Sequence, residues 1–260
     1  MSAVLSLPAT RGGAWLRPAL LGLGLLVVLV TAWQAALSLF QVPAFVMPAP
    51  LTVLAALVDQ RQAIAQALLA TLGTAVLGLL AAFALAVLLA GLFTGLPWLA
   101  RALLPIVIGL RTAPVLAIAP VLIMSFGRGL GTGIAVVVIV AFFPIMVNAM
   151  QGMAAAPRNA LELFHVCGAG PLQRFFMLRL PASLPFLFTG LRAAASAAFL
   201  AAMLAEWLSG APGLGTLILD SHAYRELGRL WAAVLVSMAA AFAIFAVTSA
   251  IERRLTAWRV

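Results

Sequence analysis

Three ionisable side chains fall inside or at the edge of long apolar segments: Arg111, Arg192 and Glu206. An unpaired charge in a bilayer costs about 2.5 kcal/mol or more, so such residues usually face a water-filled pathway or pair with a partner. Two interpretations of the arginines stay open. In the first, they line a pathway or pair with another helix. In the second, their long side chains extend to the membrane interface. For Glu206, three residues from the end of its segment, the expected partner is Arg111 or a backbone donor.

The sequence offers little for covalent or hydrolytic chemistry. It contains no lysine and therefore no glycine-rich phosphate loop ending in Gly-Lys-Ser or Gly-Lys-Thr. His165 and His222 lie far apart and lack the spacing of metal ligands. Cys167 is the single cysteine, which excludes an internal disulfide. We expect a protein that is not an enzyme and binds no metal or cofactor.

The composition indicates which solvent the chain must occupy. Of 260 residues, 65% are hydrophobic and 8% are charged, whereas soluble domains are about half apolar and a quarter charged. A net charge of +9 does not indicate nucleic-acid binding here, because the arginines are scattered between apolar runs instead of clustered. We therefore predict an all-α membrane protein, a bundle of about six transmembrane helices in a single domain over residues 1–260.

Six apolar segments are long enough to cross the hydrocarbon core, which requires about 20 residues of helix. They span about 18–40, 64–94, 101–126, 131–152, 183–208 and 230–250. The break over 41–62 contains three prolines, and its middle, 51–58, is predicted to form a short interfacial helix. The segments between the spans are short, so no separate soluble domain is expected.

The distribution of arginines predicts the orientation, because cytoplasmic loops retain more positive residues than translocated ones. If both termini are cytoplasmic, nine arginines lie inside: Arg11, Arg17, Arg101, Arg158, Arg174, Arg179, Arg253, Arg254 and Arg259. Four lie outside: Arg61, Arg128, Arg225 and Arg229. The bias favours cytoplasmic N and C termini.

The longest cytoplasmic segment in this orientation covers residues 154–182. Residues 159–167 are typical of a short helix, and Gly168 suits the left-handed position that follows one. Pro171 fits the first turn of a second short helix through Arg179, which Pro181 is expected to end.

This predicted pair of helices would present an apolar surface made of Leu163, Phe164, Leu172, Phe175 and Phe176. An exposed apolar patch rimmed by charge usually marks a partner site. The alternative is an interfacial helix that rests on lipid headgroups. The residues alone favour neither.

One motif in this segment bears on the choice between a partner site and a helix that rests on lipid. Its anchors are Glu162, Leu163, Phe164, Gly168, Leu178, Leu180 and Pro181. Their spacing resembles the EAA loop of bacterial ABC-importer permeases, written E-A-A, three residues, G, nine residues, I-x-L-P. Leu163 and Phe164 replace the two alanines, and Leu178 replaces the isoleucine.

The resemblance extends over most of the chain and is greatest to the nitrate, sulfonate and taurine branch of type I importers and its thiamine-precursor relatives. It is carried by residues 47–50, 111–120, 126–127, 142–144, 189–192, 205–207, 213–215 and 253–254, with Trp258. The resemblance implies a permease that imports a small nutrient, either a sulfonate, taurine or nitrate-like anion or a thiamine pyrimidine precursor.

Further expectations follow from the resemblance. The EAA loop would form the coupling helix that docks on a cytoplasmic ATP-binding subunit, present in two copies, which would use the ATP and Mg²⁺. A periplasmic substrate-binding protein would deliver the solute to a permease homodimer in the inner membrane. The alternative is a secondary transporter driven by an ion gradient, which would place ionisable residues near the bilayer midplane; no acidic residue lies at the centre of a span.

Overall fold

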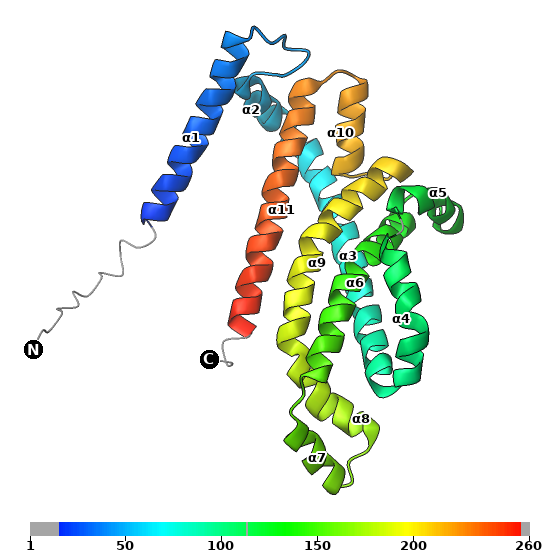
Figure 1. Ribbon diagram of the computed structural model, residues 1–260. Coiled ribbons are helices and arrows are strands. Elements are labelled where there is room, and N and C mark those ends of the chain that lie inside the picture. The colour runs from blue at the N-terminus through cyan, green and yellow to red at the C-terminus, as the bar shows by residue number, and fades with distance from the viewer. Residues whose placement is uncertain (1–15, 113, 256–260) are drawn as a thin grey trace, which may run out of the picture.

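The computed structural model describes residues 16–112 and 114–255, which are helical throughout apart from short connections. The helices are α1 (Leu16–Leu39), α2 (Pro50–Asp59), α3 (Arg61–Gly95), α4 (Pro97–Thr112), α5 (Val115–Phe126), α6 (Leu130–Ala154), α7 (Arg158–Val166), α8 (Pro171–Arg174), a π-helical turn η1 (Phe175–Arg179), α9 (Leu180–Ser209), α10 (Leu214–Ala223) and α11 (Leu227–Leu255) (Figure 1).

Four helical stretches in the described ranges are long and apolar enough to cross a membrane. They are α3, α6, the run of α8, η1 and α9, and α11. Helices also occupy the other two predicted segments, 18–40 and 101–126. The all-α membrane fold is therefore confirmed, while the number and direction of membrane crossings stay predictions.

The predicted span over 101–126 is not one helix but two. The chain breaks between α4 and α5, and Pro114 caps the start of α5 in an extended conformation. Proline has no N–H and biases the preceding residue away from helical geometry, so a helix usually ends before it. With 16 and 12 residues, each half is shorter than the roughly 20 residues of a full crossing.

The centre of the bundle is α6, which packs against α9 and α3 more extensively than any other pair of helices packs. Their buried faces include many alanines with no exposed surface: Ala82, Ala86, Ala90, Ala141, Ala149, Ala194, Ala198 and Ala202. Glycines bring the backbones closer still. A Cβ atom on Gly78 would lie 2.5 Å from Cβ of Val137, and one on Gly152 would lie 2.8 Å from Cα of Ser183. Small residues of this kind permit close helix approach within membranes.

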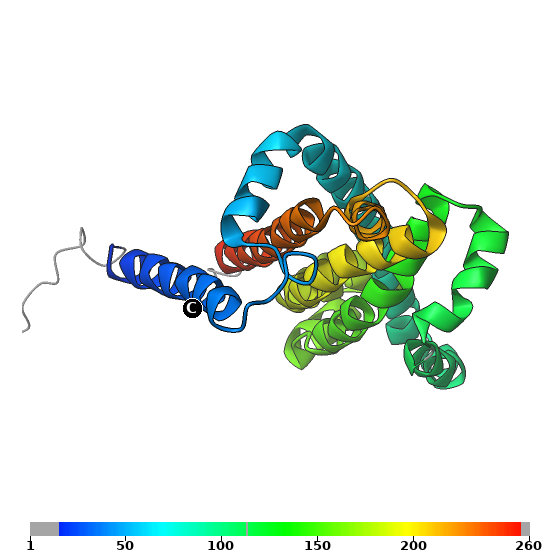
Figure 2. The ribbon, with the colours of Figure 1, turned by 90° about the horizontal axis from the view of Figure 1, so that it is seen from above.

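Helix α1 lies to one side of this bundle, as the two ribbon views show (Figures 1 and 2). Its Trp33 ring meets that of Trp231 on α11, with 5.6 Å between ring centroids. The short helix predicted over 51–58 is α2, which packs against α11 where Gly228 approaches Ala56. One helix was not predicted: α10, which lies between α9 and α11 at the same end as α2 (Figure 1).

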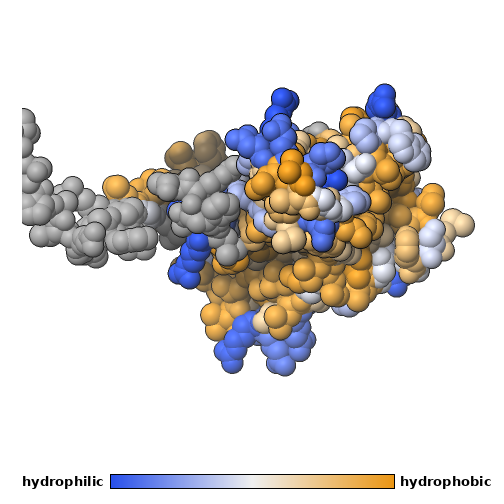
Figure 3. Space-filling view, turned by 90° about the horizontal axis from the view of Figure 1, so that it is seen from below, coloured by the Kyte–Doolittle hydropathy of each residue, from blue (hydrophilic) through white to orange (hydrophobic). Residues whose placement is uncertain are grey.

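The sides of the molecule are apolar. Seen from the end at which α7 lies, the surface is mostly hydrophobic with hydrophilic groups in separate clusters (Figure 3). On α11, Phe242 is 72% exposed and Met238 is 64% exposed. Such an exposed surface would be unstable in water, so it requires lipid or another subunit against it.

Candidate functional site

The predicted coupling segment forms an elbow, defined here as residues 158–179, at the end of the bundle opposite α2 and α10 (Figure 1). Helix α7 ends at Val166, and Gly168, which follows the capping residue Cys167, has a left-handed φ of +70°. The N–H of Gly168 donates to the carbonyl of His165 at 3.0 Å, and that of Ala169 donates to the carbonyl of Phe164 at 2.9 Å. These two bonds form a Schellman motif. The predicted helix over 159–167 and its glycine terminus are confirmed.

The second arm of the elbow does not end at Pro181. Helix α8, η1 and α9 follow without interruption, giving one helical run over Pro171–Ser209 of 39 residues, about 58 Å long at 1.5 Å per residue. The expectation that Pro181 ends the short helix is wrong. Leu180 instead donates to the carbonyl of Phe175 in a wider π turn, and Pro181 lies in the next turn, the first of α9, where a proline is tolerated.

Contacts with α3 hold the elbow in place. The guanidinium of Arg179 donates through Nη1 to the carbonyl of Thr94 on α3 at 3.1 Å. Within the elbow itself, Arg174 donates through Nε to the carbonyl of Ala169 at 3.0 Å. The Phe175 ring packs over Gly91, where a Cβ atom would approach the ring within 2.8 Å. The elbow is therefore anchored to the bundle at the end of α3.

Much of the apolar surface predicted for the elbow is exposed. Leu163 is 61% exposed, Leu172 71% and Phe176 60%, while Phe164 is half-buried. Phe175 does not belong to this surface, because it is half-buried against α3; the sequence could not show which phenylalanine faces the bundle. Val166 and Met177, 84% and 66% exposed, join the surface instead.

The other residues of the motif flank this surface. Glu162 is exposed on α7, Leu178 and Leu180 are half-buried where the elbow enters the bundle, and Pro181 is exposed. The structure therefore brings the motif together at one end of the molecule, with its glutamate at the solvent side and its leucines at the helix side.

Glu206 lies at the opposite end of α9 and is 1% exposed. Its carboxylate oxygen Oε2 accepts hydrogen bonds from the Thr71 hydroxyl at 3.0 Å and from the Gly215 N–H at 2.9 Å. The Thr71 hydroxyl in turn accepts from the N–H of Leu214 at 2.9 Å. This network fastens α3, α9 and the start of α10 together. Of the two partners expected for Glu206, the backbone donor is therefore found.

Two glycines make room for this network. A Cβ atom on Gly213 would lie 2.1 Å from the carboxyl carbon of Glu206, and one on Gly215 would lie 2.1 Å from the carbonyl oxygen of Met203. Both distances are far below van der Waals contact, so a larger residue at Gly215 would push α10 away from the α9 backbone, and one at Gly213 would displace the Glu206 carboxylate from its hydrogen bonds.

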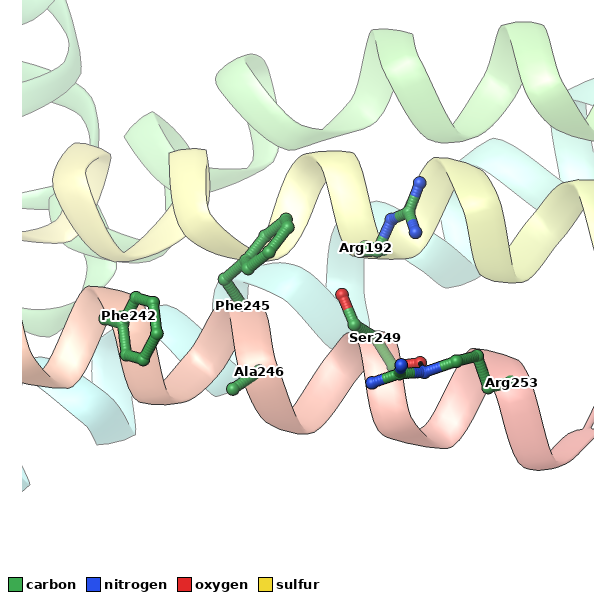
Figure 4. Close-up of a pocket in the computed structure, with 6 residues that line it drawn as sticks. All are labelled: Arg192, Phe242, Phe245, Ala246, Ser249 and Arg253. Carbon is green, nitrogen blue, oxygen red and sulfur yellow. Dashed lines mark hydrogen bonds between the residues drawn. The ribbon is translucent and has the colours of Figure 1, made fainter. Parts of the chain in front are cut away.

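Arg192 joins two helices. Its Nη1 forms a salt bridge with Oε2 of Glu252 on α11 at 2.7 Å, and Oε1 of Glu252 accepts from the Thr189 hydroxyl at 2.8 Å. Arg192 and residues of α11 line a shallow pocket (Figure 4). Arg192 is thus an inter-helix partner, and the side chain of Arg111 lies outside the described residues.

Sequence reasoning missed the partners of these charged groups, Thr71 and Glu252. A threonine within a long apolar run is a weak signal, since its hydroxyl usually bonds to its own helix. Glu252 stands beside two arginines near the C terminus, where a surface role is the ordinary expectation. Neither could be assigned to its partner without knowing how α3, α9 and α11 are placed.

The described residues contain no group of three histidine, cysteine, aspartate or glutamate side chains that could hold a metal ion. Cys167, His165 and His222 are all exposed. What the arrangement can do is mechanical: an exposed apolar elbow at one end is joined by a continuous helix to a buried polar network at the other.

Comparison with known sequences finds one protein family and several similar transport permeases. Residues 82–257 match the family model described as "Binding-protein-dependent transport system inner membrane component". The chain is 31% identical over 240 residues to the riboflavin transport system permease protein of Chloroflexus aurantiacus, covering 90% of this chain and 88% of that protein. It is 33% identical over 190 residues to the formylaminopyrimidine transport permease protein of Halalkalibacterium halodurans, covering 73% and 76%.

A solved structure has the same fold. A chain of the MetNI methionine ABC transporter, in an inward-facing conformation, superimposes with a TM-score of 0.64, covering 76% of this chain and 98% of that one. The two sequences are 18% identical, so the similarity concerns the arrangement of helices.

Proposed function

Since this chain belongs to the family of binding-protein-dependent transport system inner membrane components, and is thereby the permease component of an ABC importer, we propose that it carries a small nutrient from the periplasm to the cytoplasm. Family members work with an ATP-binding subunit and a binding protein and are themselves the non-catalytic membrane subunit. ATP and Mg²⁺ would be used by the separate ATP-binding subunit.

The elbow is the proposed docking site for that subunit. Its exposed side chains Leu163, Val166 and Leu172 form an apolar surface on short helices that have few other contacts. Glu162 lies beside them as the charged rim. This exposed apolar surface, fixed to the bundle through Arg179 and Phe175, is the observation that carries the proposal.

Coupling would pass along α9. When ATP binding brings two ATP-binding subunits together, each would move the elbow docked on it. Because α8, η1 and α9 form one helix with no break, displacement at the elbow becomes a tilt of the whole rod. Such a transition requires packed elements with two discrete arrangements, and the close packing of α3, α6 and α9 supplies rigid elements.

The proposed assembly is a homodimer in the inner membrane with the solute pathway between the two copies and both termini in the cytoplasm. The six predicted spans are few for both halves of a pathway, and the exposed apolar sides of the bundle are available for a second copy. The elbow and the C-terminal end of α11 lie at the same end of the molecule (Figure 1), which agrees with the arginine bias.

The proposed solute is a small, polar or anionic nutrient. Two relatives of similar identity are named for riboflavin and for formylaminopyrimidine, so permease identity at this level does not separate solutes. We favour a thiamine pyrimidine precursor or a sulfonate, taurine or nitrate-like anion, with selection made by the binding protein.

The experiment is reconstitution of the permease with its ATP-binding subunit in proteoliposomes. The permease alone should hydrolyse no ATP, the assembled complex should, and loaded binding protein should stimulate hydrolysis and solute uptake. A permease that transports solute with an ion gradient and without the ATP-binding subunit would refute the proposal.

A further inference from the structure

A pocket of about 390 Å³ lies between α9 and α11, near the end of the molecule that carries the elbow. Arg192 lines it from α9, and α11 contributes Phe242, Phe245, Ala246, Ser249 and Arg253. In the close-up, Phe245 and Ser249 point toward α9, and the Arg253 side chain runs back along α11 toward Ser249 (Figure 4). The contacts described above for the elbow and for Glu206 do not involve this pocket.

The lining residues change from apolar to polar along α11. Phe242, Phe245, Ser249 and Arg253 follow at spacings of three and four residues, so they lie on one face of the helix. From Phe242 to Arg253 the face extends about 16 Å, with the aromatic rings near the middle of α11 and the guanidinium near its C-terminal end. Phe242 and Phe245 are 72% and 50% exposed, so the other described helices leave the apolar part of this face largely uncovered.

The polar end of the pocket carries an excess of positive charge. Arg192 and Arg253 both line the pocket, and Arg192 is paired with Glu252, whose two oxygens are engaged by Arg192 and Thr189. In the described contacts Arg253 uses Nε, which donates to the carbonyl of Ser249 at 3.3 Å. A guanidinium has five N–H donors, so the two arginines retain donors for an anion.

The chain itself supplies few anions for this site. Of its six acidic residues, Glu206 is buried and Glu252 is already paired with Arg192. Asp59, Asp220 and Glu226 belong to the opposite end, with α2 and α10 (Figure 1), which leaves Glu162 of the elbow. A second copy would therefore bring little complementary charge, whereas the bilayer offers phosphate groups at this depth with acyl chains below them.

We propose that the groove between α9 and α11 binds an anionic phospholipid, with its phosphate held by Arg192 and Arg253 and an acyl chain lying along Phe242 and Phe245. The bound lipid would fill the groove and screen the two guanidinium groups from each other. Arg192 is kept in position by Glu252, so the cationic end of the site is formed before the lipid arrives.

The test compares neighbouring arginines in the full chain purified with its partner subunits. Arg253→Gln removes a lining cation, and Arg254→Gln removes an exposed cation that does not line the pocket. Native mass spectrometry would measure binding of phosphatidylglycerol and of phosphatidylcholine with the same acyl chains. We expect tighter binding of phosphatidylglycerol, about fivefold weaker binding in Arg253→Gln, and no change in Arg254→Gln.

Three outcomes would overturn the proposal. Equal losses in both variants would mean a diffuse attraction to the surface, without a site. Complete competition by inorganic phosphate would mean a free anion site. Disulfide-linked dimers of an Ala246→Cys, Cys167→Ser double variant in native membranes would mean that a second copy occupies the groove.

Discussion

The hydroxyl of Thr71 donates to Oε2 of Glu206 across 3.0 Å, although 135 positions separate the two residues in the sequence. The bond joins α3 to the end of α9, and the same hydroxyl accepts from the N–H of Leu214 at the start of α10. The fully buried Thr71 side chain thus forms hydrogen bonds with polar groups of two other helices.

Replacing Thr71 by valine should destabilise the permease. Valine keeps the shape but removes the hydroxyl, which leaves the buried Glu206 carboxylate and Leu214 N–H short of a partner, at a cost of about 1–3 kcal/mol. Thermal unfolding of the purified protein in detergent would show a lower midpoint. Thr71→Ser, which retains the hydroxyl, should lie close to the wild type; equal midpoints for Val and Ser would show that the bond contributes nothing.

Two glycines of α3 should respond oppositely to alanine. At Gly78 the added methyl would meet Val137 at 2.5 Å, so Gly78→Ala should destabilise by about 1–3 kcal/mol through overpacking. At Gly73 nothing lies within 4 Å, so Gly73→Ala should be neutral or stabilise by up to about 1 kcal/mol through helix propensity. Unfolding midpoints measured side by side would test the contrast, and the reverse order would contradict the packing described for α3 and α6.

Valine at Gly168 should impair transport while the protein still inserts into the membrane. The position has a φ of +70° and open space around it, so the penalty is backbone strain of about 1–3 kcal/mol without a steric clash. Uptake in proteoliposomes and ATPase stimulation are the measurements.

The matched control for that variant is Gly170→Val. Gly170 has φ −69° and ψ 167°, an extended conformation that valine adopts readily, and it lies two residues away in the same elbow. Normal uptake in Gly168→Val, or equal loss in both variants, would show that the bend itself is unimportant.

Aspartate at Leu163 should prevent association with the ATP-binding subunit. Leu163 is 61% exposed on α7, and a charge there would have to be desolvated on docking. Co-purification of the two subunits is the measurement. Leu51→Asp, at a 77% exposed position on α2, should leave co-purification intact; retention of the partner by Leu163→Asp would place the docking surface elsewhere.

Local signals in the sequence were sufficient for the elbow. Gly168 follows a segment of helical composition, and a left-handed helix terminus depends only on its immediate neighbours, so α7 and its end could be predicted. The prediction that Pro181 ends the helix was wrong because the outcome there depends on contacts with a distant helix. Proline's local preference is to stop a helix, but contacts of Arg179 and Phe175 with α3 hold the chain helical through it.

The polar network at the other end depends on long-range placement. Glu206 and the Gly213 to Gly215 segment were recognised as a pattern, yet Thr71 was not, because nothing near it in sequence indicates that α10 folds back beside α3. The break before α5 was missed because a proline in an apolar segment does not by itself show whether the helix ends: Pro105 and Pro120 lie inside helices, whereas Pro114 lies at the start of one.

The buried alanines at the contacts of α3, α6 and α9 have a consequence for motion. A methyl group has no side-chain rotamers, so fixing it in an interface loses no side-chain entropy, and it cannot adopt a second orientation. At these alanine contacts a small shift of α9 therefore requires no rotamer exchange, unlike at larger buried side chains such as Phe199. It also means that these contacts have no rotamers with which to adapt locally, so a displacement applied at one end of α9 would be passed along the helix instead of being absorbed at the interface.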